Sequence, residues 1–236
     1  MVLVTFSWDD GAIEDLKLMD LALKFNIPSL FFIPVANPER LVMSPESIKI
    51  LDNNDFEIGA HTFSHKYLTN LPLKKAVEEI VTGKDFLEQL LGKEIPHFCF
   101  PGGKYNDDLV EISRSYFKSA RTADTGILVN CNSFLIKPTF HFFNRGKKSL
   151  IYNSLIGSSI VCEMAIRNLF SHGYFNFVKD IIADLQEYPG IYRVIVWGHS
   201  WEIEENGLWH LLSDLFQWIF SNYPGSLRSY SELINK

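Results

Sequence analysis

Apolar runs of strand length alternate along most of the chain with stretches whose apolar residues recur every three or four positions. The first pattern predicts buried strands, and the second predicts amphipathic helices. The expected strands are residues 2–8, 29–35, 56–60, 96–100, 118–121 and 192–197. The expected helices are residues 13–25, 45–53, 71–91, 107–117, 173–187 and 208–220.

Several helix ends carry their own signals. Ser44, Pro45 and Glu46 stand in the order of cap, first-turn proline and first-turn acid, and Gly92 is a typical helix terminator. Residues 122–153 are broken by turn residues, with short strands expected only over 134–136 and 139–142. The chain is then expected to end with a short strand near Leu227 and a capped turn over 229–233.

Strands that alternate with helices are typical of a parallel sheet built through helical crossovers. The sequence therefore predicts an α/β fold. Hydrophobic residues make up 47% and aromatic residues 14% of the 236 residues, which is enough for a large core and excludes disorder. Because no linker, low-complexity tract or repeat interrupts the pattern, we expect one domain over residues 1–236.

Charge and cysteine content exclude several classes of protein. A net charge of −6 without a basic block argues against a nucleic-acid partner. Cys99, Cys131 and Cys162 have no paired spacing, so neither a thiolate metal site nor a disulfide framework is expected. No stretch has the apolar length of a membrane span, and no signal peptide precedes the first strand. A cytoplasmic protein is therefore expected, of unknown oligomeric state.

Acidic and imidazole groups follow three of the expected strands. Asp9 and Asp10 end the first strand, His61 and His65 follow residues 56–60, and His199 follows residues 192–197. Parallel strands would bring these five side chains to the carboxyl edge of the sheet, where α/β folds bind ligands. Two adjacent carboxylates repel each other unless one binds a metal or both share a proton.

The spacing of His61 and His65 places both rings on one face of a helical turn. With one carboxylate they form a two-histidine, one-carboxylate set that suits a catalytic divalent ion, zinc foremost. The plainer interpretations are a helix-capping aspartate and two surface histidines. The occurrence of both motifs at strand ends favours the metal site.

Four short motifs resemble those of the polysaccharide deacetylases, the NodB-like carbohydrate esterases of family four. Residues 7–11, Ser-Trp-Asp-Asp-Gly, resemble a first motif that usually reads Thr-Phe-Asp-Asp-Gly. Residues 61–65 match the second, His-Ser/Thr-x-x-His. Residues 100–103 resemble the third, with Cys99 where an arginine usually stands, and residues 194–199 resemble the last, an apolar strand closing in a histidine.

The order of these motifs agrees with the family over residues 1 to about 205. The resemblance implies a distorted, incomplete (β/α) barrel of about seven parallel strands. It also implies residue roles: Asp10, His61 and His65 as metal ligands, Asp9 as the general base for the attacking water, and His199 as the general acid for the leaving amine. The backbone N–H of Gly102 would help to hold the oxyanion.

The cysteine at position 99 leaves Asp9 without the usual arginine partner, and a neutral thiol cannot replace a guanidinium. Arg121 ends the next expected strand, so we predict that it lies within salt-bridge reach of Asp9. The plainer interpretation is a surface arginine on a loop.

The remaining histidines, His97, His141, His172 and His210, are expected to be structural. Glu202, Glu204 and Glu205 are expected to form a solvated acidic turn, and the alternative is that a loop acid near His199 orients its imidazole. Aromatic residues near the motifs are core residues on the plainer interpretation, although some could stack on a sugar ring. They are Trp8, Phe63, Tyr105, Trp197 and Trp201.

Taken with the resemblance, these residues predict a metal-dependent hydrolase that removes an N-acetyl group from an amino sugar in a saccharide or its precursor. Hydrolysis of an amide needs an activated water, charge stabilisation and a proton for the amine, and the five side chains could supply these. Two alternatives are a hydrolase of a non-sugar C–N bond and an inactive carbohydrate-binding domain. Joint retention of an acid and a base argues against the second alternative.

Overall fold

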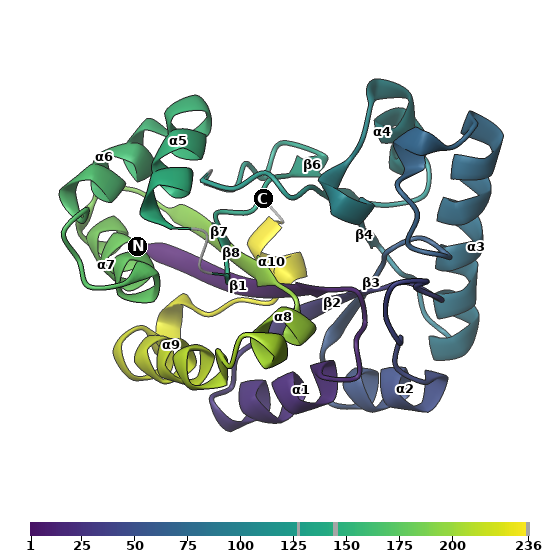
Figure 1. The fold of residues 1–236 in the computed structure, drawn as a ribbon, viewed down its shortest axis with the longest axis horizontal. Helices are drawn as coiled ribbons and strands as arrows, with labels where there is room; N and C mark the ends of the chain where they lie inside the picture. Colours follow the sequence, from purple (N-terminus) through teal and green to yellow (C-terminus); the bar gives the residue numbers. More distant parts are fainter. Residues whose placement is uncertain (127, 144–145, 235–236) are drawn as a thin grey trace.

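A computed structural model describes residues 1–126, 128–143 and 146–234. Its centre is a sheet of eight parallel strands (Figure 1). The strands are β1 (Val2–Asp9), β2 (Ser29–Ile33), β3 (Glu57–Ala60), β4 (His97–Cys99), β5 (Ser119–Arg121), β6 (Leu135–Ile136), β7 (Phe140–His141) and β8 (Tyr192–Gly198).

The strand order is β6-β5-β4-β3-β2-β1-β8-β7, and every pairing is parallel. The two shortest strands, β6 and β7, form the two edges, and no pairing joins them among the described residues. The expected incomplete (β/α) barrel is therefore confirmed, with eight strands in place of about seven. Because all strands are parallel, their carboxyl ends share one edge, as expected.

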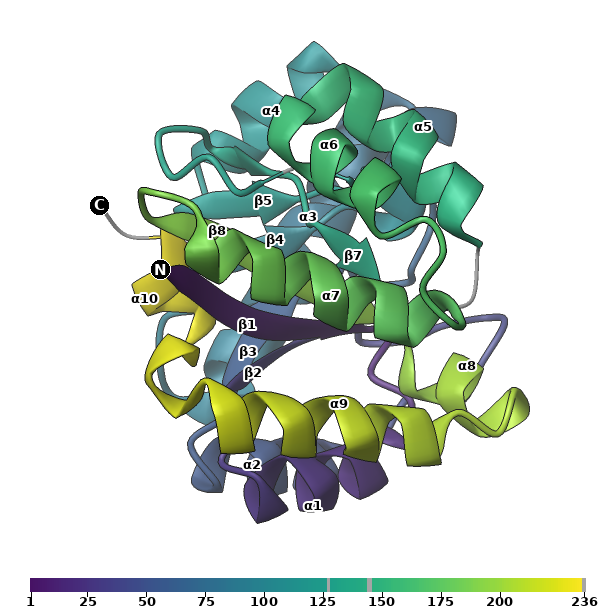
Figure 2. The same ribbon diagram turned by 90° about the vertical axis from the view of Figure 1, so that its left-hand side faces the viewer.

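Helices surround the sheet on its outer side (Figures 1 and 2). The helices that follow the first strands are α1 (Asp15–Lys24), α2 (Pro45–Asn53), α3 (Leu73–Leu91) and α4 (Asp107–Arg114). Their ends follow the expected signals. The Ser44 side chain accepts from the Ser47 N–H at the start of α2, and Gly92 closes α3 in a left-handed conformation.

The core lies between these helices and the central strands. All eight residues of β1 are buried, as expected for a strand covered on both faces. In Figure 2, α7 (Tyr174–Glu187) and α9 (Trp209–Asn222) run alongside β1. The ring of Phe6 on β1 meets the ring of Phe216 on α9 edge to face, with centroids 4.9 Å apart. This packing fixes the strand that ends at Asp9 and leads into Asp10.

Several elements differ from the expectations. Helices α5 (Lys147–Gly157) and α6 (Ser159–Arg167) occupy a stretch for which no helix was expected. The reason for α5 is that polar and apolar residues are mixed around its circumference: Leu150 and Ser154 are buried, whereas Leu155 and Ile156 are 66% and 81% exposed. A helix without separate polar and apolar faces gives no amphipathic signal.

Smaller corrections concern short elements. Helix α4 ends at Arg114, before the expected residue 117, and the expected strand at Leu227 is only an isolated bridge to Val4. The expected turn over 229–233 is the helix α10 (Tyr230–Ile234), and α8 (Ser200–Glu205) was not expected. Part of the irregular stretch 122–153, namely residues 127, 144 and 145, lies outside the described residues.

Within the described part of the chain, no helix combines the length and the apolar character needed to cross a membrane.

Candidate active site

A cleft of about 530 Å³ opens at the carboxyl edge of the strands. It brings together the side chains of Asp9, Asp10, His61, His65 and His199, as the strand-end pattern predicted. The cleft is lined by Asp9, Asp10, Glu39, His61, His65, Tyr67, Gly102, Gly103, Lys104, Ala123, Asp124, Trp197, His199, Trp201 and Glu202.

Asp10, His61 and His65 converge on one point. The Nε2 atoms of His65 and His61 lie 2.9 Å and 3.5 Å from Oδ1 of Asp10. The predicted grouping is therefore present, but the predicted helical turn is wrong. Residues 61–65 are irregular, with positive φ angles of 69° at Thr62 and 54° at His65, and this segment still places the two rings 4.9 Å apart.

The loop that carries both histidines is held against α3 by polar contacts. Ser64 donates from its backbone N–H and its hydroxyl to the carboxylate of Glu79, at 2.7 Å and 2.6 Å. Helix α3 approaches closely because Gly83 has no side chain: a Cβ there would lie 2.6 Å from the carbonyl carbon of Thr62. The tight helix contact and the charge-assisted hydrogen bonds fix the loop.

The donor set fits a divalent ion. The ring nitrogens and the carboxylate lie within 4.8 Å of one another, and Oδ1 of Asp10 is buried without a hydrogen-bond partner that meets normal geometry. Burial would raise the pKa of Asp10, but interactions with His61 and His65 outweigh it and hold that pKa well below its ordinary value. His61 Nδ1 lies 2.7 Å from the carbonyl oxygen of Cys99, which leaves its Nε2 facing Asp10.

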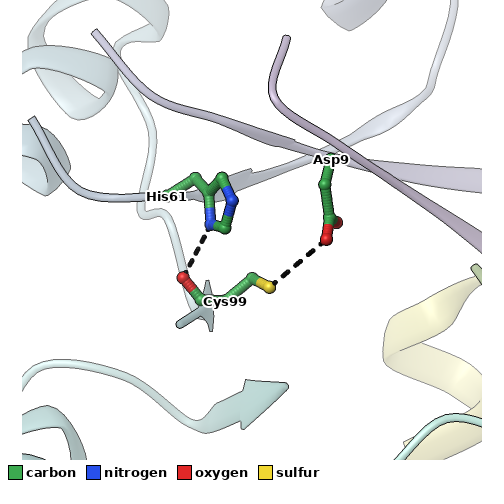
Figure 3. Close-up of side chains that lie close together, drawn as sticks. All are labelled: Asp9, His61 and Cys99. Atoms are coloured by element: carbon green, nitrogen blue, oxygen red, sulfur yellow. Dashed lines mark hydrogen bonds between the residues drawn. The ribbon is translucent and has the colours of Figure 1, made fainter. Parts of the chain in front are cut away.

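Asp9 has a different environment from its neighbour. Both of its carboxylate oxygens accept from the guanidinium of Arg121, which is fully buried, so the predicted contact is confirmed. Figure 3 shows Cys99 beside Asp9, with Sγ 3.7 Å from Oδ2. Burial raises the pKa of the Cys99 thiol well above its ordinary value, so the sulfur is uncharged and Arg121 supplies the positive charge.

The sheet register explains how Arg121 reaches Asp9. Cys99 on β4 and Arg121 on β5 are direct partners in the parallel ladder, so their side chains point to the same face. The small cysteine leaves room for the longer side chain from the next strand. The guanidinium also lies over the rings of Trp197 and Phe32, 4.8 Å and 5.2 Å from their centroids, and these contacts fix it further.

His199 lines the same cleft from the end of β8, at the N-cap of α8. Its Nδ1 is 2.7 Å from Oε2 of Glu202, and its Nε2 is 3.8 Å from Oδ2 of Asp10. Burial lowers the pKa of His199, but the hydrogen bond to Glu202 and the nearby carboxylates outweigh it, so the pKa is raised.

Two residues near His199 were not assigned to the site from the sequence. Glu202 is not in a solvated turn: its side chain is 13% exposed, and its pKa falls to about 2 because contacts with His141 and His199 outweigh burial. His141 Nε2 lies 3.0 Å from Oε2 of Glu202, so His141 belongs to the site and is not only structural. Glu204 and Glu205 are exposed, as expected.

Gly102 and His97 agree more closely with the sequence predictions. Gly102 lines the cleft with a φ of 60°, and a Cβ there would lie 2.7 Å from the ring of Tyr67. Its role at the oxyanion stays a prediction. His97 is buried and contacts the hydroxyls of Ser119 and Ser231, as expected of a structural histidine.

Comparison with known protein families tests the resemblance carried by the motifs. Residues 2–117 match the family model described as polysaccharide deacetylase. The resemblance to the polysaccharide deacetylases seen in the sequence is therefore confirmed over this part of the chain.

A peptidoglycan-N-acetylglucosamine deacetylase from Bacillus cereus is 29% identical over 123 residues, which are 51% of this chain and 53% of that protein. The chain thus spans about half the length of this curated relative.

Two solved structures share the fold at low identity. A family 4 carbohydrate esterase from Streptomyces lividans, in complex with acetate, is 13% identical, with a TM-score of 0.57 over 96% of this chain and 91% of that chain. A CE4 family pseudoenzyme from Bacillus anthracis is also 13% identical, with a TM-score of 0.59 over 99% of this chain and 65% of that chain. At such identity the likeness concerns the fold alone, so the activity must be argued from this cleft.

Proposed function

We propose that this chain is a metal-dependent hydrolase that removes an N-acetyl group from an amino sugar in a saccharide or saccharide precursor. One observation carries the proposal. A single cleft holds a candidate divalent-ion site, a carboxylate paired with a buried cation, and a carboxylate-bound histidine. These are the groups that amide hydrolysis requires.

Asp10, His61 and His65 would hold the ion, with zinc as the first candidate because of the imidazole donors. When bound, such an ion would polarise the amide carbonyl and lower the pKa of water. The three side chains come from the turn after β1 and the loop after β3, and the carbonyl of Cys99 orients the ring of His61.

Asp9 would accept the proton of the attacking water. Arg121 holds both of its oxygens in place and compensates its negative charge in a buried site. We therefore assign Arg121 as a positioning residue that acts through Asp9. The assignment explains how the site functions without the arginine that the family usually has at position 99.

His199 would donate a proton to the leaving amine. Glu202 fixes the ring through Nδ1 and leaves Nε2 directed toward the cleft. A hydrogen bond of this kind to a carboxylate raises the pKa of the imidazole and favours its protonated form. The backbone N–H of Gly102, at the rim of the same cleft, is proposed to help hold the oxyanion.

The substrate is proposed to be an N-acetylated sugar. The cleft exposes the aromatic rings of Tyr67 and Trp201, which can pack against the apolar face of a sugar ring. The name of the Bacillus cereus relative supports the same substrate class. The single domain, the cytoplasmic location and the zinc ion stay predictions.

The test is an acetate-release screen of metal-loaded protein against N-acetylated monosaccharides, nucleotide sugars and oligosaccharides. Release from one of them, lost in His199→Ala, would support the proposal. Release of ammonia or acetate only from non-sugar amides would favour the alternative hydrolase. Sugar binding without any release would favour the inactive carbohydrate-binding domain.

A further inference from the structure

Trp201 of α8 lies at the cleft and contacts the proposed metal ligand Asp10. Its indole N–H donates to Oδ2 of Asp10 at 2.8 Å. An indole nitrogen can only donate, so this bond has one direction and does not compete for a metal ion. The second oxygen, Oδ1, is the one that faces the Nε2 atoms of His61 and His65. The two carboxylate oxygens are thus assigned different partners.

Asp10 has a φ of 78°, in the left-handed region, which a residue with a Cβ seldom adopts. This backbone conformation sets where the side chain of Asp10 starts, but it does not fix the plane of the carboxylate. A partial rotation of the carboxylate plane about the Cβ–Cγ bond would turn Oδ1 away from the nitrogens of His61 and His65. The bond from Trp201 opposes that rotation from outside the ligand set.

Arg40 covers the indole of Trp201 from the loop between β2 and α2. Its guanidinium carbon lies 3.3 Å from the indole centroid, and its Nη1 lies 2.7 Å from Oε1 of Glu205 at the end of α8. A single cation–π contact at a half-buried ring near the surface contributes little. Glu205 is exposed, so its ion pair adds little. Arg40 therefore steadies Trp201 weakly.

We infer that Trp201 is a positioning residue for the metal ligand Asp10 and that Arg40 holds Trp201 in place. The inference rests on the proposed function, because it needs an ion at Asp10. Hydrogen bonds to the outer side of a metal ligand typically change metal affinity by about 10-fold to 100-fold when they are removed.

The chain offers a matched control at Trp209. The Trp209 indole also donates to a carboxylate, that of Glu204, and Lys17 lies over its ring at 4.4 Å while pairing with Glu204. Trp209 is half-buried, like Trp201, and does not line the cleft. Trp209→Phe therefore removes the same kind of contact away from the site.

The experiment measures the Kd for Zn²⁺ of metal-free protein by competition with a chromophoric chelator. Trp201→Phe keeps a ring beneath Arg40 but removes the donor, and should weaken Zn²⁺ binding by about 10-fold to 100-fold. Trp209→Phe should change the Kd less than about twofold. Arg40→Ala, the second variant, should weaken binding by about threefold, as the loss of one cation–π contact predicts.

Thermal unfolding of each metal-free variant shows whether it is folded. If Trp201→Phe does not fold, the Kd of Arg40→Ala tests the role of Trp201 instead. The inference would be overturned if folded Trp201→Phe bound Zn²⁺ as tightly as the wild type, or if Trp201→Phe and Trp209→Phe weakened binding equally. Either result would leave the proposed function intact. No Zn²⁺ binding by the wild-type protein would overturn both.

Discussion

The two sides of the cleft hold their charged groups by different means. On the base side, Asp9 and Arg121 stand on strands β1 and β5, and Arg121 is fully buried. On the acid side, His199 and Glu202 begin a helix of six residues, and their side chains are 16% and 13% exposed. The base side is fixed by the sheet, whereas the acid side depends on a few hydrogen bonds near solvent.

This difference suits the two proposed tasks. A base that acts on one bound water benefits from a rigid, dry environment with its charge compensated. An acid that must regain a proton in every cycle benefits from contact with water. Substitutions on the base side should therefore cost both stability and turnover, and those on the acid side mainly turnover and pH dependence.

The largest loss of activity is expected from substitution of the metal ligands, which belong to neither the base side nor the acid side. His61→Ala and His65→Ala should each lose the bound ion and with it the activity, since two protein ligands bind a divalent ion weakly. Elemental analysis of the purified variants checks this, with exposed His210→Ala as the control. Full metal occupancy in both variants would refute the ligand assignment.

On the base side, Asp9→Asn should retain the ion and lose on the order of 10²-fold or more in kcat, because the amide cannot accept the proton. Metal content and kcat measured on the same preparation separate Asp9 from Asp10, whose substitution should abolish both. Near-normal turnover in Asp9→Asn would remove Asp9 from the role of base.

Arg121→Ala tests whether the base side is also structural. Breaking a buried ion pair leaves an uncompensated charge and should lower the free energy of unfolding by about 3–5 kcal/mol. The variant should also lower kcat while leaving metal content unchanged. Chemical denaturation gives the comparison with exposed Arg114→Ala, which loses a surface ion pair and a contact over the ring of Phe134 and should stay within about 1 kcal/mol of wild type. Equal stability of the two variants would contradict the burial argument.

The acid side should respond mainly in its pH profile. Glu202 raises the pKa of His199, so the protonated acid persists to higher pH and is lost as the pH rises through that pKa. Glu202→Gln removes this support, and the alkaline limb of kcat should move to lower pH with a roughly 10-fold lower maximum. The control is Glu204→Gln, an exposed glutamate that contacts Lys17. An unmoved limb in Glu202→Gln would show that Glu202 does not tune the acid.

Much of the base side, and the metal ligands, could be predicted from the sequence, because long buried strands give strong periodic signals. The strand ends placed Asp9, Asp10, His61 and His65 at one edge, and the order of strands pointed from Cys99 to Arg121. The local turn at His61–His65 could not be predicted, since left-handed backbone at Thr62 and His65 leaves no composition signal.

The acid side was less predictable for physical reasons. Helix α8 is too short for a periodic pattern, so Glu202 looked like one of three solvated acids. His141 stands on a two-residue strand, and its contact with Glu202 joins segments 61 residues apart. Contacts of this kind are set by tertiary packing and not by local sequence.

The central claim is that one ion held by Asp10, His61 and His65 enables acetate release in this cleft. The most direct measurement is acetate released from an N-acetylated sugar by metal-free protein during titration with Zn²⁺. The account predicts no release without the ion, a rise that saturates near one equivalent per chain, and no rise in His61→Ala. Equal release by the metal-free protein, or an undiminished rise in His61→Ala, would contradict it.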